Sequence, residues 1–473
     1  MIITRFAPSP TGDPHIGNIR TTLFTYLFAK KNNGKFLLRI EDTDRERHNE
    51  GSIEVIKEAL EWLGLIPENL NDPMVQSTRL DIYKKAALKL VEQGDAYICT
   101  CTKDELDQMR QDQIAKGLPP KYSGKCRKIP VEKWKMENGK WKIPEGSVIR
   151  MKIPENQKIR FNDLVRGEVE FDTATIDDQV ILKSDDYPTY HLAHVIDDNE
   201  MQITHVIRAE EWLPSTPKHI LLNKMLGFQA PEYAHVPVIL SPTKGKLSKR
   251  DGAVGILEYK KMGYLPEAVI NFMALLGWNP KTEEEYFTIA ELEQRFELSQ
   301  VNKAPAVFDI EKLNHYGEKY LKDQISNLKM TSQNLEILKP WGIENLTESE
   351  LELLGRGGYA TLREMAEYIL KLRQIPEFPA EMLVFKKSTI EDSKIGLSAL
   401  SSQLSALENW TEDELQKQLE TVVSQNSLSN GDVFWPVRVA LSGEEKSPSP
   451  IELLLALGQE ESMRRINRAL ELI

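Results

Sequence analysis

Hydrophobic positions near the N-terminus change their period within the first 65 residues. Short apolar runs at 2–6 and 35–40 predict buried strands, and the spacing in 19–30 predicts a helix between them. A second helix follows, with apolar residues three or four apart and Ser52 as its candidate N-cap. This βαβα order predicts a doubly wound α/β sheet, which binds ligands at the carboxyl ends of its strands.

Further elements follow from the same patterns. We predict strands in 148–153, 168–171 and 238–240, and one over 203–207 that ends at Arg208. After residue 322 the apolar spacing is helical, in 348–354, 361–372, 412–423 and 451–457. Thr347 and Glu350 form a predicted capping box. Most of the charges of Arg464, Arg465 and Arg468 on a final helix are expected to face solvent.

Composition narrows the class of protein. A chain of 473 residues is too long for one hydrophobic core, and three or more domains are expected. No run of eighteen apolar residues occurs and no secretory signal begins the chain, so we expect a soluble cytoplasmic protein without a membrane partner. Three cysteines, all between Cys99 and Cys126, fit a reducing compartment.

Charge is uneven along the chain. The net charge of −12 argues against general nucleic-acid binding, yet 121–142 holds eight Lys/Arg against two Glu. Trp134, Trp141 and Tyr122 are interleaved with these cations. Two interpretations remain open: the segment binds a nucleic-acid backbone and stacks a base, or its tryptophans fill a small core.

The loop over residues 5–18 carries the first candidate chemistry. Its three prolines prevent regular structure, and Gly12 and Gly17 allow close approach before the helix begins near Asn18. A helix start presents backbone N–H groups and partial positive charge, so it can hold a phosphate with His15 as an added donor. A structural turn histidine is the alternative.

A second candidate segment lies more than two hundred residues later. Lys246, Ser248, Lys249 and Arg250 place three cations and a hydroxyl in a glycine-flanked stretch. With His15–Asn18, this segment resembles the paired nucleotide signatures of class I aminoacyl-tRNA synthetases. Residues 5–12, 39–44 and 206–212 narrow the resemblance to bacterial glutamyl-tRNA synthetases, over nearly the whole chain.

This resemblance implies an activity and a set of domains. The expected reaction ligates L-glutamate to tRNA(Glu) using ATP with Mg²⁺, through glutamyl-adenylate, at the 2′-hydroxyl of the terminal adenosine. The implied domains are a Rossmann-like catalytic domain (1–80 and 195–242) and an inserted acceptor-end-binding domain (81–194). A stem-contact domain (243–322) and an all-helical anticodon-binding domain (323–473) follow, and the family expectation is a monomer.

The resemblance also implies roles for individual residues. Those expected to bind ATP are His15, Gly17, Asn18, Ser248 and Lys249, and those expected to act in catalysis are His15, Lys246 and Lys249. Those expected to bind glutamate are Arg5, Ala7, Ser9, Glu41, Tyr190, His194 and Arg208. The residues alone leave two alternatives: Glu41 caps the next helix, and Arg208 pairs with Glu210. His194 departs from the family pattern, which has Asn there.

Cys99, Cys101 and Cys126 are spaced as zinc ligands can be. Some members of the resembled family hold a structural zinc here, with a fourth ligand two residues after the last cysteine. That position is Lys128, which cannot serve while protonated, and Tyr122 is a poor substitute. No bound zinc is therefore expected.

One departure in the C-terminal part bears on tRNA choice. In related enzymes that charge only tRNA(Glu), an arginine closely preceding a Thr-Leu pair reads the third anticodon base. Gly358 occupies that position here, which predicts that tRNA(Gln) is charged as well; alternatively the alignment shifts by two residues and Arg356 reads the base.

Two other functions would share part of this sequence pattern. A glutaminyl-tRNA synthetase would share the catalytic fold but would end in β-barrels. A catalytically inactive tRNA-binding relative would have no need of intact signature motifs. A shortened tRNA-modifying relative is excluded by the length of the chain.

Overall fold

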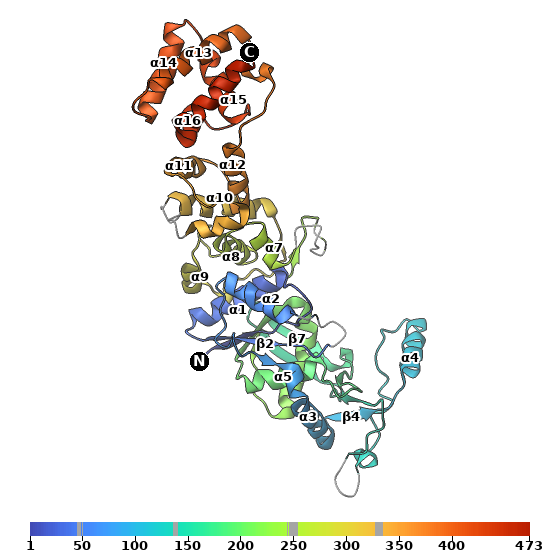
Figure 1. The fold of residues 1–473 in the computed structure, drawn as a ribbon. Helices are drawn as coiled ribbons and strands as arrows, with labels where there is room; N and C mark the ends of the chain where they lie inside the picture. Colours follow the sequence, from blue (N-terminus) through green and yellow to red (C-terminus); the bar gives the residue numbers. More distant parts are fainter. Residues whose placement is uncertain (45–48, 50, 136–140, 244, 246–253, 327–333) are drawn as a thin grey trace. The chain divides into compact units, whose positions relative to one another are not determined.

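A computed structural model describes residues 1–44, 49, 51–135, 141–243, 245, 254–326 and 334–473. The chain divides into two compact units, which are taken separately below. The first contains residues 1–260 and 269–310, and the second contains 261–268 and 311–473. The predicted fold class is confirmed: an α/β sheet region comes first and a helical region ends the chain (Figure 1).

The strands are all found before residue 308 in the described part of the chain. They are β1 (Ile3–Phe6), β2 (Lys35–Ile40), β3 (Met74–Val75), β4 (Ala96–Cys99), β5 (Val148–Met151), β6 (Lys158–Asp163), β7 (Gly167–Asp172), β8 (Val180–Leu182), β9 (His205–Ala209), β10 (Glu232–Val236), β11 (Ile239–Leu240) and β12 (Ala306–Val307). The helices before residue 310 are α1 (Ile16–Lys31), α2 (Ser52–Trp62), α3 (Leu80–Gln93), α4 (Lys103–Ala115), α5 (Tyr190–Glu200), α6 (Thr216–Leu226), α7 (Ile256–Lys261), α8 (Pro266–Leu275) and α9 (Ile289–Arg295). Short 3₁₀ segments occur at Gln76–Arg79, Val131–Trp134, Thr173–Thr175, Glu210–Ser215, Leu298–Gln300, Asn334–Trp341 and Ala380–Leu383.

Two mainly parallel sheets position the site. Strands β1, β2 and β3 form one, and β9, β10 and β6 form the other with β7 antiparallel at its edge. The Thr204 amide donates to the Ile3 carbonyl (2.9 Å), which joins β1 to the start of β9. Beyond the strand ends, the Glu41 amide donates to the Pro8 carbonyl (2.9 Å). The loops after β1 and β2 therefore lie together, as the βαβ pattern predicts.

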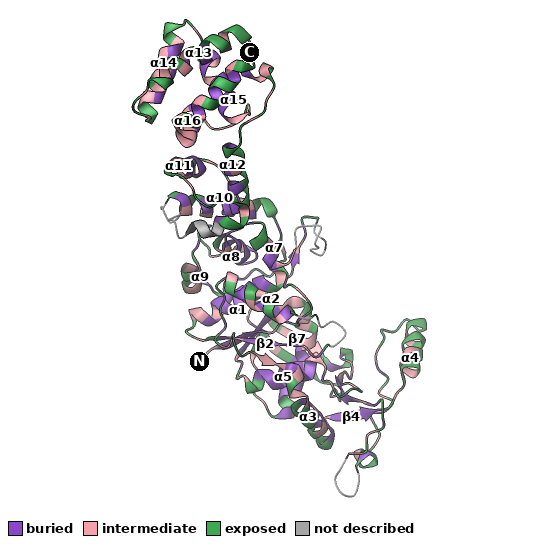
Figure 2. Cartoon of the chain, in the orientation of Figure 1, coloured by how far each residue is buried: buried purple, intermediate pink, exposed green. Residues whose placement is uncertain are grey.

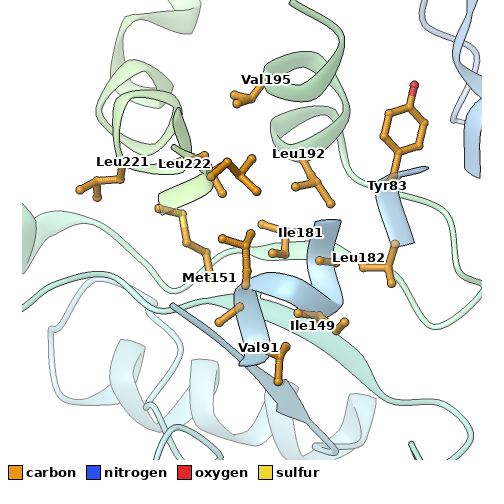
Figure 3. Packing of buried hydrophobic residues seen from close by; sticks show 14 of the residues in the cluster. Tyr83, Val91, Ile149, Met151, Ile181, Leu182, Leu192, Val195, Leu221 and Leu222 are labelled. Carbon is orange, nitrogen blue, oxygen red and sulfur yellow. The ribbon is translucent and has the colours of Figure 1, made fainter. Parts of the chain in front are cut away.

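An antiparallel sheet of β4, β5 and β8 carries an extended apolar cluster of this unit. Figure 3 shows Ile149, Met151 and Ile181 of the sheet facing Leu192 of α5 and Leu222 of α6. The sheet before residue 184 and helices α5 and α6 after it therefore share one apolar cluster.

Two predicted boundaries are wrong in detail. Gly51, not Ser52, is the N-cap of α2; it has φ 81°, where glycine is strongly favoured, and Ser52 is the buried first residue of the helix. Strand β9 begins at His205 rather than at residue 203 and ends at Ala209. Both ends of the strand differ from the prediction by one or two residues, but Arg208 still lies near its carboxyl end.

The second unit is helical where the structure describes it. Its helices are α10 (Ile310–Ser326), α11 (Glu348–Arg356), α12 (Leu362–Arg373), α13 (Ile390–Ser405), α14 (Glu412–Gln425), α15 (Asn430–Ser442) and α16 (Pro450–Glu471). The capping box of Thr347 and Glu350 is confirmed. Each helix carries buried residues on part of its surface and exposed residues on the rest (Figure 2).

One expected surface charge lies in the core of this unit. Arg465 is 2% exposed and donates to the carbonyls of Leu441 and Leu372, and it pairs with Glu461. Arg465 is the exception to the expectation that most of these charges face solvent, because its guanidinium satisfies carbonyl groups inside the helical packing. Arg464 and Arg468 are partly exposed, as predicted.

Within the described residues, every helix is too short or too polar to cross a membrane.

Candidate active site

A cavity of about 2070 Å³ opens at the carboxyl ends of β1, β2 and β9 in the first unit. Most residues predicted to bind ATP or glutamate line it. These are Arg5, Ala7, Ser9, His15, Gly17, Asn18, Glu41, Tyr190 and Arg208. The exception among the described residues is His194, which lies behind Tyr190 with its ring stacked on the tyrosine (centroids 5.1 Å apart, 9° between planes).

His15 caps α1 with its side chain. Its Nδ1 accepts hydrogen bonds from the amides of Gly17 (3.0 Å) and Asn18 (3.4 Å). Because Nδ1 accepts, the neutral ring carries its proton on Nε2. A Cβ on residue 17 would lie 2.9 Å from the imidazole Cε1, so glycine is needed there to admit the ring.

This geometry bears on the predicted phosphate contact. The first amides of α1 were predicted to point outward to an anion, but two of them are already used by His15. A capped donor has no remaining hydrogen to give. The predicted roles of His15, Gly17 and Asn18 toward ATP stay predictions.

The glutamate-side residues form a buried ionic network. Arg39 of β2 pairs with Glu41 (2.8 Å) and with Asp198 (2.6 Å), and Arg5 pairs with Asp198 (3.1 Å). Burial opposes ionisation of Asp198, but Arg5 and Arg39 hold its pKa well below the usual range. Glu41 is thus bound to Arg39 and does not cap a helix, so that alternative is wrong.

Arg208 differs from the other arginines of this site. It is 6% exposed, and among the described residues its hydrogen-bond partners are uncharged side chains. The acceptors are Thr216 Oγ1 (2.8 Å), His235 Nε2 (3.0 Å), Tyr190 OH (3.2 Å) and His219 Nδ1 (3.2 Å). Burial lowers the pKa of both histidines and raises that of Tyr190, so all stay neutral near pH 7.

The alternative pairing of Arg208 with Glu210 is also excluded. The Glu210 carboxylate binds Arg166 and accepts from the Val238 amide (3.0 Å). Within the described residues, no carboxylate pairs with Arg208. A buried guanidinium without an anion is costly unless a ligand supplies one, so this corner of the cavity favours a carboxylate.

Several residues of the site were missed from the sequence. Arg39 and Asp198 hold Arg5 and Glu41, and Thr216 and His219 hold Arg208. One signal was present for α6: Thr216, His219 and Asn223 are polar residues at helical spacing, and all three are buried beside apolar residues of the same helix.

The second nucleotide segment cannot be placed. Lys246, Ser248, Lys249 and Arg250 lie outside the described residues, and their predicted roles stay predictions.

The three cysteines come together beside β4. Their sulfurs and the Tyr122 hydroxyl form one cluster: Tyr122 OH lies 3.4 Å from both Cys99 Sγ and Cys101 Sγ, and Cys101 Sγ lies 3.6 Å from Cys126 Sγ. The Cys126 amide donates to the same hydroxyl oxygen (3.0 Å). The hydroxyl oxygen of Tyr122 therefore joins the three sulfur atoms as a fourth polar atom of the cluster.

The aromatic residues of the basic segment pack inward. Trp134 is buried and Trp141 is partly buried against the apolar cluster of the first unit, while Tyr122 lies among the cysteines. Of the two interpretations of 121–142, these side chains favour the small core over base stacking.

The candidate anticodon residues lie in the second unit. Arg356 ends α11 and its guanidinium pairs with Glu452 (2.7 Å) and, more distantly, with Glu412 (3.9 Å). Gly358 follows two residues later, and a Cβ there would meet only the Glu318 carboxyl group, at 3.7 Å. The backbone at residue 358 thus has room for a larger side chain.

Comparison with known proteins agrees with this architecture. Residues 1–315 match the catalytic domain of class I tRNA synthetases (E and Q), and residues 335–470 match an anticodon-binding domain. A glutamate–tRNA ligase of Dehalococcoides mccartyi strain CBDB1 is 43% identical, over 98% of this chain and 96% of the relative. The chain belongs to the glutamate–tRNA ligase family.

Further relatives of this family support the assignment. A glutamate–tRNA ligase of Alkaliphilus metalliredigens is 40% identical, over 98% of this chain and 97% of its own. A crystal structure of a glutamate–tRNA ligase from Elizabethkingia meningosepticum in complex with its amino acid is 35% identical and superposes with a TM-score of 0.87, covering 99% of both chains. As in that family, the present chain joins a class I catalytic region to a helical anticodon-binding region.

Proposed function

We propose that this chain ligates L-glutamate to tRNA(Glu) at the expense of ATP. The observation that carries the proposal is Arg208: a buried guanidinium with only neutral partners faces a cavity that also contains His15. A glutamate side-chain carboxylate supplies the missing negative charge and makes charge-assisted hydrogen bonds. Glutamine, with a neutral amide, does not.

The first step forms glutamyl-adenylate. An oxygen of the substrate α-carboxylate attacks the α-phosphorus of ATP, the bond from that phosphorus to the bridging oxygen breaks, and pyrophosphate leaves. His15 donates from Nε2 to phosphate oxygens, and Lys246 and Lys249 offset charge in the transition state. Mg²⁺, when bound with ATP, neutralises phosphate charge and is held mostly by phosphates and water. Glu41 is placed beside Arg39 to receive the substrate amino group.

The second step transfers the glutamyl group. The 2′-hydroxyl of the terminal adenosine attacks the acyl carbon, the bond to the phosphate oxygen breaks and AMP leaves, with the hydroxyl proton lost to AMP or solvent. We assign the acceptor end to residues 81–194, with catalytic segments at 1–80 and 195–242. The stem contact is assigned to 243–322 and the anticodon to 323–473.

The proposed reaction has a direct test. Purified protein is incubated with ATP, Mg²⁺, labelled glutamate and tRNA(Glu), and esterified label is counted. We expect ATP-dependent charging of native tRNA(Glu) and of tRNA ending in 3′-deoxyadenosine, but not of tRNA ending in 2′-deoxyadenosine. The absence of charging of native tRNA(Glu) would refute the function, and charging of the 2′-deoxy form would refute the site of transfer.

We also propose that the cysteine cluster holds a structural zinc. Zn–S bonds of about 2.3 Å and a Zn–O bond of about 2.0 Å place neighbouring ligand atoms of a tetrahedron roughly 3.5–3.8 Å apart. The separations of 3.4 and 3.6 Å between Tyr122, Cys99, Cys101 and Cys126 are close to those edges. The position of the Tyr122 hydroxyl supports it as the fourth ligand, although the sequence marks tyrosine as a poor one. When bound, zinc would link β4 to the segment after it.

Metal analysis tests this zinc site. We expect about one zinc per chain in protein purified without chelators, and a lower affinity for zinc after Tyr122→Phe, because an oxygen donor is lost. The matched control is Lys128→Ala, which changes the position used by relatives and should leave zinc content unchanged. A zinc-free wild type, or equal affinity in the wild type and Tyr122→Phe, would contradict the ligand set.

We further propose that tRNA(Gln) is charged with glutamate as well as tRNA(Glu). Gly358 has no side chain to read an anticodon base, and Arg356 is engaged by Glu452. The Arg356 pair is half exposed and contributes at most about 1 kcal/mol, so RNA could displace it. The two positions therefore need separate variants.

Charging of the two purified tRNAs distinguishes these positions. We expect the wild type to charge both, and Gly358→Arg to reduce charging of tRNA(Gln) by about 5- to 100-fold, as expected for one base contact. A Cβ at residue 358 meets nothing closer than the Glu318 carboxyl group, at 3.7 Å. Strict rejection of tRNA(Gln) by the wild type, relaxed in Arg356→Ala, would contradict the role of Gly358 and assign base reading to Arg356.

A further inference from the structure

Arg208 is followed by a series of hydrogen-bonded, buried polar side chains that do not line the cavity. Its members are Asp163 at the end of β6, His235 on β10, His219 on α6 and His191 on α5. His235 Nδ1 lies 2.6 Å from Asp163 Oδ2, and His219 Nε2 lies 2.9 Å from His191 Nδ1. None of the four lines the cavity, so none is placed to touch a substrate.

The direction of each hydrogen bond follows from Arg208. A guanidinium only donates, so His235 Nε2 and His219 Nδ1 must both be unprotonated acceptors. The single ring proton of His235 is then on Nδ1 and is donated to Asp163. That of His219 is on Nε2 and is donated to His191. Arg208 thereby fixes the tautomer of each histidine, and their outer partners complete both bonds.

Asp163 is itself fixed by the backbone. Its Oδ1 accepts from the amides of Val165 (3.0 Å) and Arg166 (2.8 Å). Burial opposes its ionisation, but these hydrogen bonds and that from His235 lower the pKa of Asp163. The Asp163 carboxylate is therefore separated from Arg208 by the His235 ring. It holds that ring and does not contact the guanidinium.

The alternative partner for a buried arginine would be a carboxylate. Such a pair would satisfy the guanidinium permanently and would weaken its attraction for a second anion. Neutral imidazole acceptors orient the same N–H groups and leave the net charge in place. Arg5 and Arg39, by contrast, are already paired with Asp198.

We propose that His219 and His235 are positioning residues that aim Arg208 at the substrate while leaving its charge uncompensated. The inference rests on the proposed function, in which Arg208 binds the glutamate side-chain carboxylate. It predicts that loss of an imidazole acceptor weakens glutamate binding selectively. Binding of ATP, which the proposed function assigns to the His15 turn, should be spared.

His219 offers the sharper test because its two nitrogens have separate tasks. His219→Asn retains an acceptor where Nδ1 lies, and His219→Leu keeps an apolar volume without one. The matched control is His205→Leu: His205 is also buried and belongs to the same strand as Arg208, but it contacts Phe28 and Thr204 instead. KM for glutamate and for ATP are measured by charging of tRNA(Glu), with thermal melts of each variant.

We expect His219→Leu to raise KM for glutamate about tenfold or more, with KM for ATP within about twofold, because a hydrogen bond to a charged group is lost. His219→Asn should recover most of that loss, and His205→Leu should leave both KM values near the wild type. Equal effects of His219→Leu and His219→Asn, or equal changes in both KM values, would show a packing role and overturn the proposal.

Measuring the wild type in the same assay distinguishes failure of the proposed function from failure of the positioning role. If it does not charge tRNA(Glu) with glutamate, the proposed function fails. If it does, but His219→Leu leaves KM for glutamate unchanged, only the positioning role fails. If His219→Leu does not fold, His235→Gln replaces it; its amide oxygen can accept where Nε2 lies, and we expect KM for glutamate within about threefold of wild type, against a tenfold or larger rise for His235→Leu.

Discussion

Replacing Arg208 by glutamine is expected to raise KM for glutamate about 100-fold or more, because a buried charge-assisted pair with the substrate is lost. KM for ATP should stay near the wild-type value, since the proposed nucleotide contacts are at the His15 turn, which lines the same cavity. The measurement is charging of tRNA(Glu) over a range of glutamate and ATP concentrations.

A matched variant controls for loss of an arginine as such. Arg295→Gln removes a partly exposed guanidinium that pairs with Glu284 on the same unit, and it should leave both KM values unchanged. Equal loss of affinity for glutamate and ATP in Arg208→Gln would show a general collapse of the site. It would contradict the assignment of Arg208 to the substrate carboxylate.

Replacing His15 by asparagine is expected to lower kcat about 100-fold, because the Nε2–H that we propose as a donor to the phosphates is lost. Asparagine is a good N-cap, so the variant should still accept the Gly17 amide and keep α1 intact. Its free energy of unfolding should fall by less than about 0.5 kcal/mol. Kinetics and denaturant titration are run on the same samples.

His15→Ala separates capping from catalysis. It loses both the donor and the cap, so it should match His15→Asn in kcat and lose about 1 kcal/mol more stability. If His15→Asn kept activity within about threefold of wild type, His15 would serve the helix alone. The structural alternative left open by the sequence would then be correct.

Local features were predictable because their causes are local. The capping box of Thr347 and Glu350 depends on two residues three apart, and the βαβ start depends on short apolar runs. The positions of Arg5, Glu41 and Arg208 beside one cavity followed from strand ends and from resemblance. Each of these features depends on residues that are close together in the sequence or on a recognisable motif.

Pairings between distant segments were not predictable. Arg5 meets Asp198 across 193 positions, and nothing in the sequence indicates which carboxylate a given arginine selects. The position of Tyr122 among the thiols and the burial of Arg465 also depend on contacts between separate segments of the chain. A charge pattern predicts exposure on average, whereas packing decides which guanidinium finds carbonyl acceptors inside.

The most direct test of the central claim compares two amino acids that differ at one group. Wild-type protein is given tRNA(Glu) and ATP with either labelled glutamate or labelled glutamine. Because Arg208 lacks a carboxylate partner among the described residues, we expect kcat/KM for glutamate to exceed that for glutamine by about 10³ or more. Comparable charging with glutamine, or no charging with glutamate, would contradict the account.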